Sequence, residues 1–304
     1  MILSAGRAIV HLLEGVAIGA ANVIPGVSGG TMALIFGIYE RLILLLGLLT
    51  KAGLRLLRFD VSGFLDHMRR VEWAFFIALF AGILIAPILG AALIPELMAR
   101  YPEASRSLFF GLILGTLPIP WLRIGRRNAR LVLIALSAAA VSFFLTGFPP
   151  QELADPGLPA VFFAAAVAIC AMILPGVSGA FLLLVLGMYE PVLAAVRDGV
   201  WPVIIVFCAG AAIGLGSFAL GLRVLLDRAH DATMAALVGL MAGSLRALWP
   251  WLSNDRGLEL PGPGDPVANV ILLGFAGLCV SAAITWYEVT KGNLEPEQPS
   301  DGPA

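Results

Sequence analysis

Long apolar runs separated by short polar segments dominate the chain. Six of them cover residues 73–93, 108–121 with flanks, 131–148, 202–226, 233–251 and 267–287. An α-helix needs about 20 apolar residues to cross the hydrocarbon layer of a bilayer. The runs lack the alternation of apolar and polar residues that marks a membrane β-barrel strand. The pattern therefore predicts an all-α polytopic membrane protein.

Two further apolar runs are interrupted in the same way. Residues 21–40 read ANVIPGVSGGTMALIFGIYE, and residues 171–190 read AMILPGVSGAFLLLVLGMYE. Ten of the twenty positions are identical, including the unbroken block PGVSG. Proline removes a backbone donor, and with the neighbouring glycines it ends one helix before the next begins. Each run is therefore predicted to be a broken helix.

The similarity extends beyond the breaks and indicates a duplicated chain. At an offset of 128, GLILGTL at 111–117 matches GLMAGSL at 239–245, and Trp73 and Trp121 match Trp201 and Trp249. At an offset of 139, the last run of each half repeats more weakly. The predicted organisation is an N-terminal repeat at 1–148, an external linker at 149–159, a C-terminal repeat at 160–290 and a disordered cytoplasmic tail at 291–304.

Basic residues predict how the repeats are oriented, because they concentrate in short cytoplasmic loops. The segments 51–72 and 123–130 are basic, whereas 149–159 lacks Lys and Arg. Each repeat would hold a broken hairpin, about 8–49 in the first, plus three spans, and this odd number inverts the second copy. We therefore expect two inverted-topology repeats, with hairpins that are re-entrant or fully spanning, and a cytoplasmic C-terminus. The extra segment 51–72 is expected to be amphipathic on the membrane surface; a lipid head-group clamp is the alternative.

Composition narrows the chemistry. Apolar residues make up 60% of the chain and charged residues 13%. In a membrane protein the placement of charges matters more than their sum, so the net charge of −1 says little about partners. The cysteines and histidines are scattered without metal-like spacing: Cys170, Cys208, Cys279, His11, His67 and His230. We expect buried thiols, no metal site, no cofactor and no nucleic-acid partner. Homo-oligomerisation is left open by the sequence.

The breaks are the predicted binding site. Inverted repeats with broken helices at matching positions are a strong sequence indication of a transporter site. The helix that starts after a break presents free N–H groups and a positive dipole end, which suit a phosphate or carboxylate. The alternative is that the glycines only allow close packing and the proline only kinks the helix. The first copy is the more polar, because Asn22, Gly30 and Thr31 become Met172, Ala180 and Phe181.

Four charged residues are further candidates. Glu14, Glu40 and Glu190 lie near the breaks and are either solvated interfacial carboxylates or proton-relay acids that couple transport to a gradient. Arg246 lies in an otherwise apolar run, so it either snorkels to the external surface or faces a cavity and binds an anion.

The motif NVIPGVSGGTMALIFGIYERLI, its second copy ILPGVSGAFLLLVLGMYEPVL and the spans after each resemble a family now linked to polyprenyl-phosphate translocation (PopT). The resemblance covers about residues 6–288. Because the sequence has no Walker-type ATP site, a proton or sodium gradient or the disposal of the substrate is expected to drive transport. The resemblance implies a bacterial inner-membrane protein that returns undecaprenyl phosphate, the lipid carrier of cell-wall synthesis, from the outer to the inner leaflet. It places the substrate path at Asn22, Pro25, Gly26, Ser28, Gly29, Gly30, Thr31, Pro175, Gly176, Ser178 and Gly179.

Other functions remain to be distinguished at this point. A secondary transporter of a small soluble anion would use the same dipole-lined site but enclose its whole substrate. An intramembrane enzyme such as a lipid phosphatase would need clustered His, Arg or Asp residues, and the sequence has no P-loop, GxSxG motif or metal-ligand cluster. We therefore predict a protein that is not an enzyme. A scramblase-like protein would show no coupling to a gradient.

Overall fold

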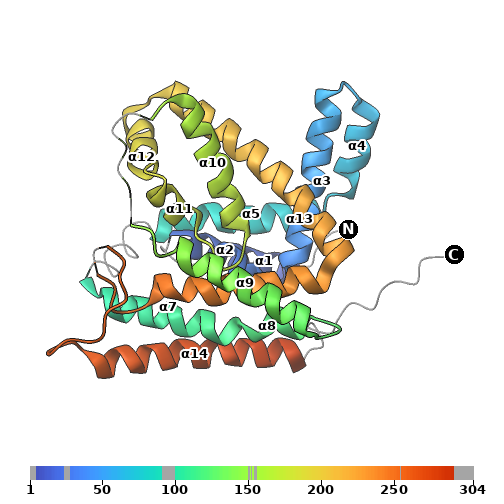
Figure 1. The fold of residues 1–304 in the computed structure, drawn as a ribbon. Helices are drawn as coiled ribbons and strands as arrows, with labels where there is room; N and C mark the ends of the chain where they lie inside the picture. Colours follow the sequence, from blue (N-terminus) through green and yellow to red (C-terminus); the bar gives the residue numbers. More distant parts are fainter. Residues whose placement is uncertain are drawn as a thin grey trace.

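The computed structural model describes residues 5–23, 28–90, 100–149, 151, 153, 156–253 and 255–290, and every regular element in these ranges is a helix (Figure 1). The predicted tail at 291–304 and the motif residues Pro25 and Gly26 lie outside the described ranges. The helices are α1 (Ala5–Val23), α2 (Gly29–Ile35), α3 (Tyr39–Leu57), α4 (Val61–Arg70), α5 (Trp73–Gly90), α7 (Pro102–Thr116), α8 (Pro118–Leu122), α9 (Ala129–Leu145), α10 (Leu158–Ile173), α11 (Gly179–Val185), α12 (Tyr189–Asp198), α13 (Trp201–Ser244), η1 (Leu245–Leu248) and α14 (Val267–Thr290).

The apolar helices fit a helical membrane protein. Within the described ranges, Pro102–Leu122 and Trp201–Leu248 are long and apolar enough to cross a bilayer, and α11 with α12 forms a third candidate that is bent by 103°. Shorter apolar helices cover Trp73–Ala86, Ala129–Leu145, Leu158–Ile173 and Val267–Ala283. Large apolar side chains such as Ile77, Leu133 and Ile271 are more than half exposed on these helices. Such surfaces are expected where the solvent is lipid rather than water.

Two predicted spans are joined into α13. The helix runs from Trp201 to Ser244, and its backbone leaves helical geometry at Ala229 (φ −145°, ψ 46°). This kink lies between the apolar runs 202–226 and 233–251. The structure therefore joins the two predicted spans into one continuous helix that is kinked between them.

The segment 51–72 forms a helical hairpin. Helix α3 continues from Tyr39 to Leu57, and α4 returns beside it; in Figure 1 the pair projects away from α7, α9 and α14. Asp60 starts α4 by accepting a hydrogen bond from the Gly63 N–H (2.9 Å). The tip carries strongly exposed apolar side chains, including Leu57 at 78% and Phe59 at 91%. The tip of the hairpin therefore presents apolar side chains at the surface of the protein.

Two equivalent helix pairs pack through glycine. Helix α1 lies against α5, and a Cβ on Gly82 would stand 2.1 Å from the Leu12 carbonyl oxygen. Helix α10 lies against the first half of α13, and a Cβ on Gly210 would stand 2.3 Å from the Phe162 carbonyl oxygen. The numbers of Gly82 and Gly210 differ by 128, and those of Leu12 and Phe162 by 150, which are two offsets of the sequence repeat. Small residues allow such backbone approach between membrane helices.

The remaining spans pair across the two halves of the chain. Helix α7 lies against α14, where a Cβ on Gly111 would meet the Gly274 carbonyl oxygen at 1.9 Å. Helix α9 lies against the second half of α13, where a Cβ on Gly239 would meet the Ala135 carbonyl oxygen at 2.1 Å. Gly111 and Gly239 are again related by the offset of 128, and Ala135 and Gly274 by the offset of 139. The second span of each half therefore packs on the third span of the other half.

Candidate functional site

The first break lies between α1 and α2. Ser28 has extended backbone geometry and caps α2 by accepting a hydrogen bond from the Gly30 N–H through Oγ (3.2 Å). The Asn22 Oδ1 accepts a hydrogen bond from the Gly29 N–H (2.9 Å), and the Ser28 carbonyl accepts one from the Thr31 N–H (3.0 Å). The first N–H groups of α2 are thus satisfied within the protein.

The second break repeats this capping. Helix α10 ends at Ile173, and Pro175 and Gly176 form the turn that follows. Gly176 adopts a positive φ of 81°, which glycine tolerates without steric cost. Ser178 caps α11 by accepting a hydrogen bond from the Phe181 N–H through Oγ (3.3 Å). Gly179 begins α11 and is buried.

The two breaks contact each other. The Ser28 hydroxyl donates to the Leu174 carbonyl (2.8 Å), and the Gly176 N–H donates to the Thr31 Oγ1 (3.0 Å). Gly30 lies against the same turn, where a Cβ would stand 2.3 Å from the Ile173 carbonyl oxygen. Ser28 and Thr31 are 1% and 0% exposed. Segments from the two halves of the chain therefore form one buried polar junction, in which the Ser28 hydroxyl and the Gly176 N–H already donate to acceptors within the protein.

Glu40 lies in a cluster that the sequence does not predict. At the start of α3 its Oε1 lies 3.2 Å from Arg123 Nη1 and 3.5 Å from His230 Nε2. The Nδ1 of His230 lies 3.6 Å from Asp231 Oδ1. The neighbouring Tyr39 is fully buried, and its hydroxyl has no hydrogen-bond partner within the described residues. A carboxylate, an imidazole and a guanidinium are therefore brought together from α3, the turn after α8 and the kink of α13.

Glu14 also pairs with a histidine. Its Oε2 lies 2.7 Å from His11 Nδ1 one turn earlier on α1, and both side chains are almost buried. The His11 ring packs edge-on against Phe75, and the Arg41 guanidinium lies 3.8 Å from the centroid of the same ring. The third candidate acid, Glu190, is exposed on α12. Two of the three histidines that appear scattered in the sequence thus pair with the two candidate acids of the first half.

Arg246 donates hydrogen bonds to two backbone carbonyls. Its Nη1 and Nη2 donate to the carbonyls of Phe143 and Arg256 (both 3.3 Å), and its guanidinium stands 4.6 Å from the centroid of the Phe143 ring. Its Nε is buried and has no partner within the described residues. The half-buried side chain therefore joins α9 to the loop before α14.

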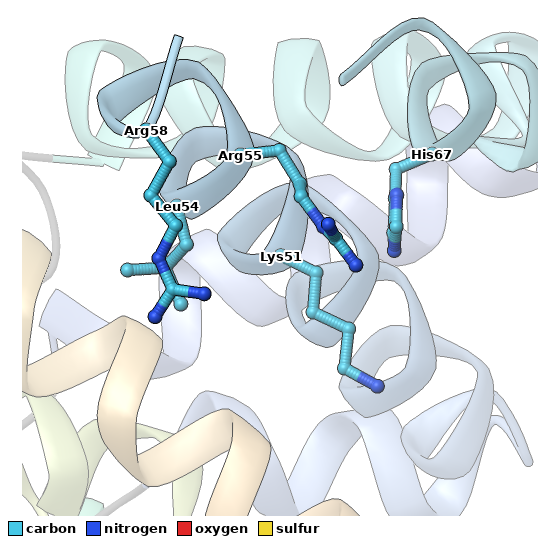
Figure 2. A pocket seen from close by; sticks show the side chains of 5 residues that line it. All are labelled: Lys51, Leu54, Arg55, Arg58 and His67. Carbon is cyan, nitrogen blue, oxygen red and sulfur yellow. The ribbon is translucent and has the colours of Figure 1, made fainter. Parts of the chain in front are cut away.

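A separate basic pocket lies on the α3–α4 hairpin. Figure 2 shows that Lys51, Leu54, Arg55, Arg58 and His67 line it. One of its cations is neutralised locally, because Arg55 Nη1 lies 2.9 Å from Asp60 Oδ2. Within the described ranges, no group of three His, Cys, Asp or Glu side chains could hold a metal ion.

The relatives and the family model that match this chain agree with one another. The chain is 39% identical over 255 residues to a polyprenyl-phosphate transporter of Vibrio cholerae, which covers 82% of each chain. It is 26% identical over 264 residues to a polyprenyl-phosphate transporter of Staphylococcus aureus, which covers 81% of this chain and 88% of the relative. No solved structure gives a significant match. The model of the VCA0040-like family, described as undecaprenyl phosphate translocase-like, matches residues 18–259, and the chain belongs to this family.

Proposed function

We propose that this protein translocates undecaprenyl phosphate across the bacterial inner membrane and returns the carrier lipid for cell-wall synthesis. The names of the two relatives support a polyprenyl-phosphate substrate. The observation that carries the mechanism is the contact between the two helix breaks, in which Ser28 donates to the Leu174 carbonyl and Thr31 accepts from the Gly176 N–H. The binding site proposed is this junction.

The repeats are proposed to have inverted topology. The support is the reciprocal packing of α7 on α14 and α9 on α13 at positions separated by the sequence offsets of 128 and 139. Such an exchange is expected when two copies are related by a two-fold axis between them, and the odd number of spans expected in each repeat would place this axis in the membrane plane. The breaks then enter from opposite faces and meet between the leaflets.

The junction offers a route for the phosphate. A phosphate in hydrocarbon pays a large desolvation cost unless polar groups replace its water. Separation of the two breaks would release the Ser28 hydroxyl and the Gly176 N–H, which then become donors for the head group. The polyprenyl chain extends through a lateral opening of the protein into the lipid. Only the charged head group therefore has to be kept out of the hydrocarbon. Opening and closing of this contact is the proposed transport step.

The hairpin of α3 and α4 is placed on the cytoplasmic surface. Its exposed Leu57 and Phe59 suit the acyl boundary, and its basic residues around Lys51 and Arg58 suit anionic head groups. Arg123 and His230 then lie at the cytoplasmic end of the path beside Glu40. The C-terminus is cytoplasmic in the same arrangement.

Glu40 is the proposed coupling acid. Glu40→Gln should remove the acceleration of transport by a pH gradient, because glutamine cannot carry a proton between His230 and the cytoplasm. Movement of the lipid between leaflets is measured with and without the gradient. Glu190→Gln is the matched control, since Glu190 has the equivalent position in the second repeat but is exposed. A full response to the gradient in Glu40→Gln would contradict the assignment.

The substrate is tested directly with purified protein in liposomes. We expect undecaprenyl phosphate to move between leaflets faster than in protein-free liposomes, and faster still with a pH gradient. Undecaprenol, which lacks the phosphate, should gain nothing from the gradient. Movement without any response to a gradient would indicate a scramblase. Failure of folded protein to move the lipid, together with uptake of a soluble anion such as phosphate, would instead indicate a secondary transporter of small anions.

A further inference from the structure

A cluster of three arginines stands beside the second break, on the external side of the proposed topology. Arg106 lies in the second turn of α7, Arg246 in η1 and Arg256 in the loop before α14. The Arg246 Nη2 donates to the Arg256 carbonyl (3.3 Å), and Arg106 Nη1 donates to the Pro250 carbonyl of the same loop (3.2 Å). All three side chains are half-buried. The cluster therefore gathers cations from two spans and one loop.

The cluster has no compensating acid. Within the described residues, no carboxylate lies within ion-pair distance of Arg106, Arg246 or Arg256, although other arginines such as Arg123 and Arg223 have such partners. Glu103, almost one turn before Arg106 on α7, acts on it only from a greater distance. Burial and the charges of Arg106 and Arg246 lower the pKa of Arg256 to about 10, which leaves it cationic at neutral pH. Like charges held together in this way are stabilised by a bound anion.

The cluster also has an unused hydrogen-bond donor. A guanidinium carries five N–H donors, and the hydrogen bonds of these arginines go to backbone carbonyls, including one from Arg256 Nε to Thr146 (3.0 Å). Arg246 Nε and Trp251 Nε1 are buried and have no partner within the described residues. Buried donors without acceptors are costly, so the Nε of Arg246 would gain from an anion bound at the cluster. Guanidinium groups bind phosphate especially well because their paired donors match two of its oxygens.

Phe181 connects the cluster to the second break. The Arg256 guanidinium stands 4.2 Å from the centroid of the Phe181 ring, and the Phe181 N–H donates to Ser178, the cap of α11. Phe181 replaces the Thr31 of the first copy. The replacement of threonine by phenylalanine makes the second motif less polar, but it provides an aromatic ring for a cation–π contact with Arg256.

We infer that Arg106, Arg246 and Arg256 form a site for a phosphate monoester at the external mouth of the path, where the substrate is captured before it reaches the junction of the breaks. The inference builds on the proposed function, which supplies the lipid and its route. The site itself recognises a dianionic phosphate, whether on a lipid or free in solution. In this conformation the Ser28 hydroxyl and the N–H groups of Gly29, Gly30 and Gly176 already have acceptors within the protein, so the cluster is expected to carry the phosphate binding that is measured.

Binding of farnesyl phosphate, a short polyprenyl phosphate, to the full-length protein in detergent tests the inference. We expect Arg246→Gln and Arg256→Gln each to weaken binding about tenfold or more, the loss expected for a charge-assisted hydrogen bond. Arg197→Gln is the matched control, because Arg197 is 76% exposed on α12 and pairs with Asp198. Farnesol should not bind the cluster. Competition by inorganic phosphate at the same concentration as farnesyl phosphate would assign the site to free phosphate and overturn the lipid capture role.

A second measurement uses the unaltered protein, in case the variants do not fold. Phenylglyoxal modifies arginines, and peptide mapping reports each one. Farnesyl phosphate should protect Arg246 and Arg256 from modification and leave Arg197 unprotected. Equal modification with and without the ligand, or unchanged affinity in folded variants, would overturn the inference. Intact binding without any movement of lipid in liposomes would instead count against the proposed function and leave the site standing.

Discussion

Replacement of Ser28 by leucine is expected to abolish the movement of undecaprenyl phosphate. Ser28 is 1% exposed, its hydroxyl donates to the Leu174 carbonyl, and it caps α2 through the Gly30 N–H. Leucine removes all of these hydrogen bonds and adds volume at the contact between the breaks. A buried donor or acceptor left without its partner costs about 1–3 kcal/mol, and overpacking costs a similar amount. The junction can then neither close nor present its donor, and transport in proteoliposomes should fall to the protein-free rate.

Two further variants separate transport from folding. Ser28→Ala keeps the volume low and removes only the hydroxyl, so it should fold and transport more slowly than the unaltered protein. Ser217→Leu makes the same replacement as the first variant at an exposed position of α13, where the hydroxyl donates to the Ile213 and Gly214 carbonyls of its own helix. Its transport should be unchanged. Full activity of a folded Ser28→Leu protein would remove the breaks from the substrate path.

Much of the helical architecture can be predicted from hydropathy and from the repeat. The runs 73–93, 131–148 and 267–287 correspond to α5, α9 and α14, because about 20 apolar residues leave few other structures in lipid. The PGVSG block predicts where helices end, since proline and glycine act through local backbone geometry. Ser28 and Ser178 cap the helices that follow, as serine commonly does. These features depend on neighbouring residues in the chain and are therefore visible in sequence.

The partners of the polar side chains could not be predicted in the same way. His230 and Glu40 belong to different halves of the chain, and the kink of α13 brings them together. The loop that contains Arg256 is acidic overall, so its composition does not predict that Arg256 contacts the Phe181 ring. The donors at the first break illustrate the same limit. The sequence predicts free N–H groups, whereas Asn22 and Ser28 accept hydrogen bonds from them in the folded chain.

Gly111→Ala and Gly239→Ala should destabilise the protein strongly and to a similar extent. In each case the new Cβ would lie within about 2 Å of a backbone carbonyl oxygen, that of Gly274 or Ala135. A backbone atom cannot move aside as a flexible side chain can, so α7 must separate from α14, or α13 from α9. We expect a loss of about 1–3 kcal/mol or more in each variant, the usual cost of overpacking. Thermal unfolding of the purified variants in detergent measures it.

Gly221→Ala provides the matched control, because Gly221 also lies within α13 but has open space around the added Cβ. Its unfolding temperature should stay the same or rise slightly, since alanine favours the helix. Similar losses at Gly111 and Gly239 are expected if the two halves repeat one packing scheme, because these glycines occupy equivalent positions in the two repeats. A large loss at one position with none at the other would mean that only one of the two contacts is tight. The repeated sequence would then not carry the reciprocal packing on which the inverted arrangement rests.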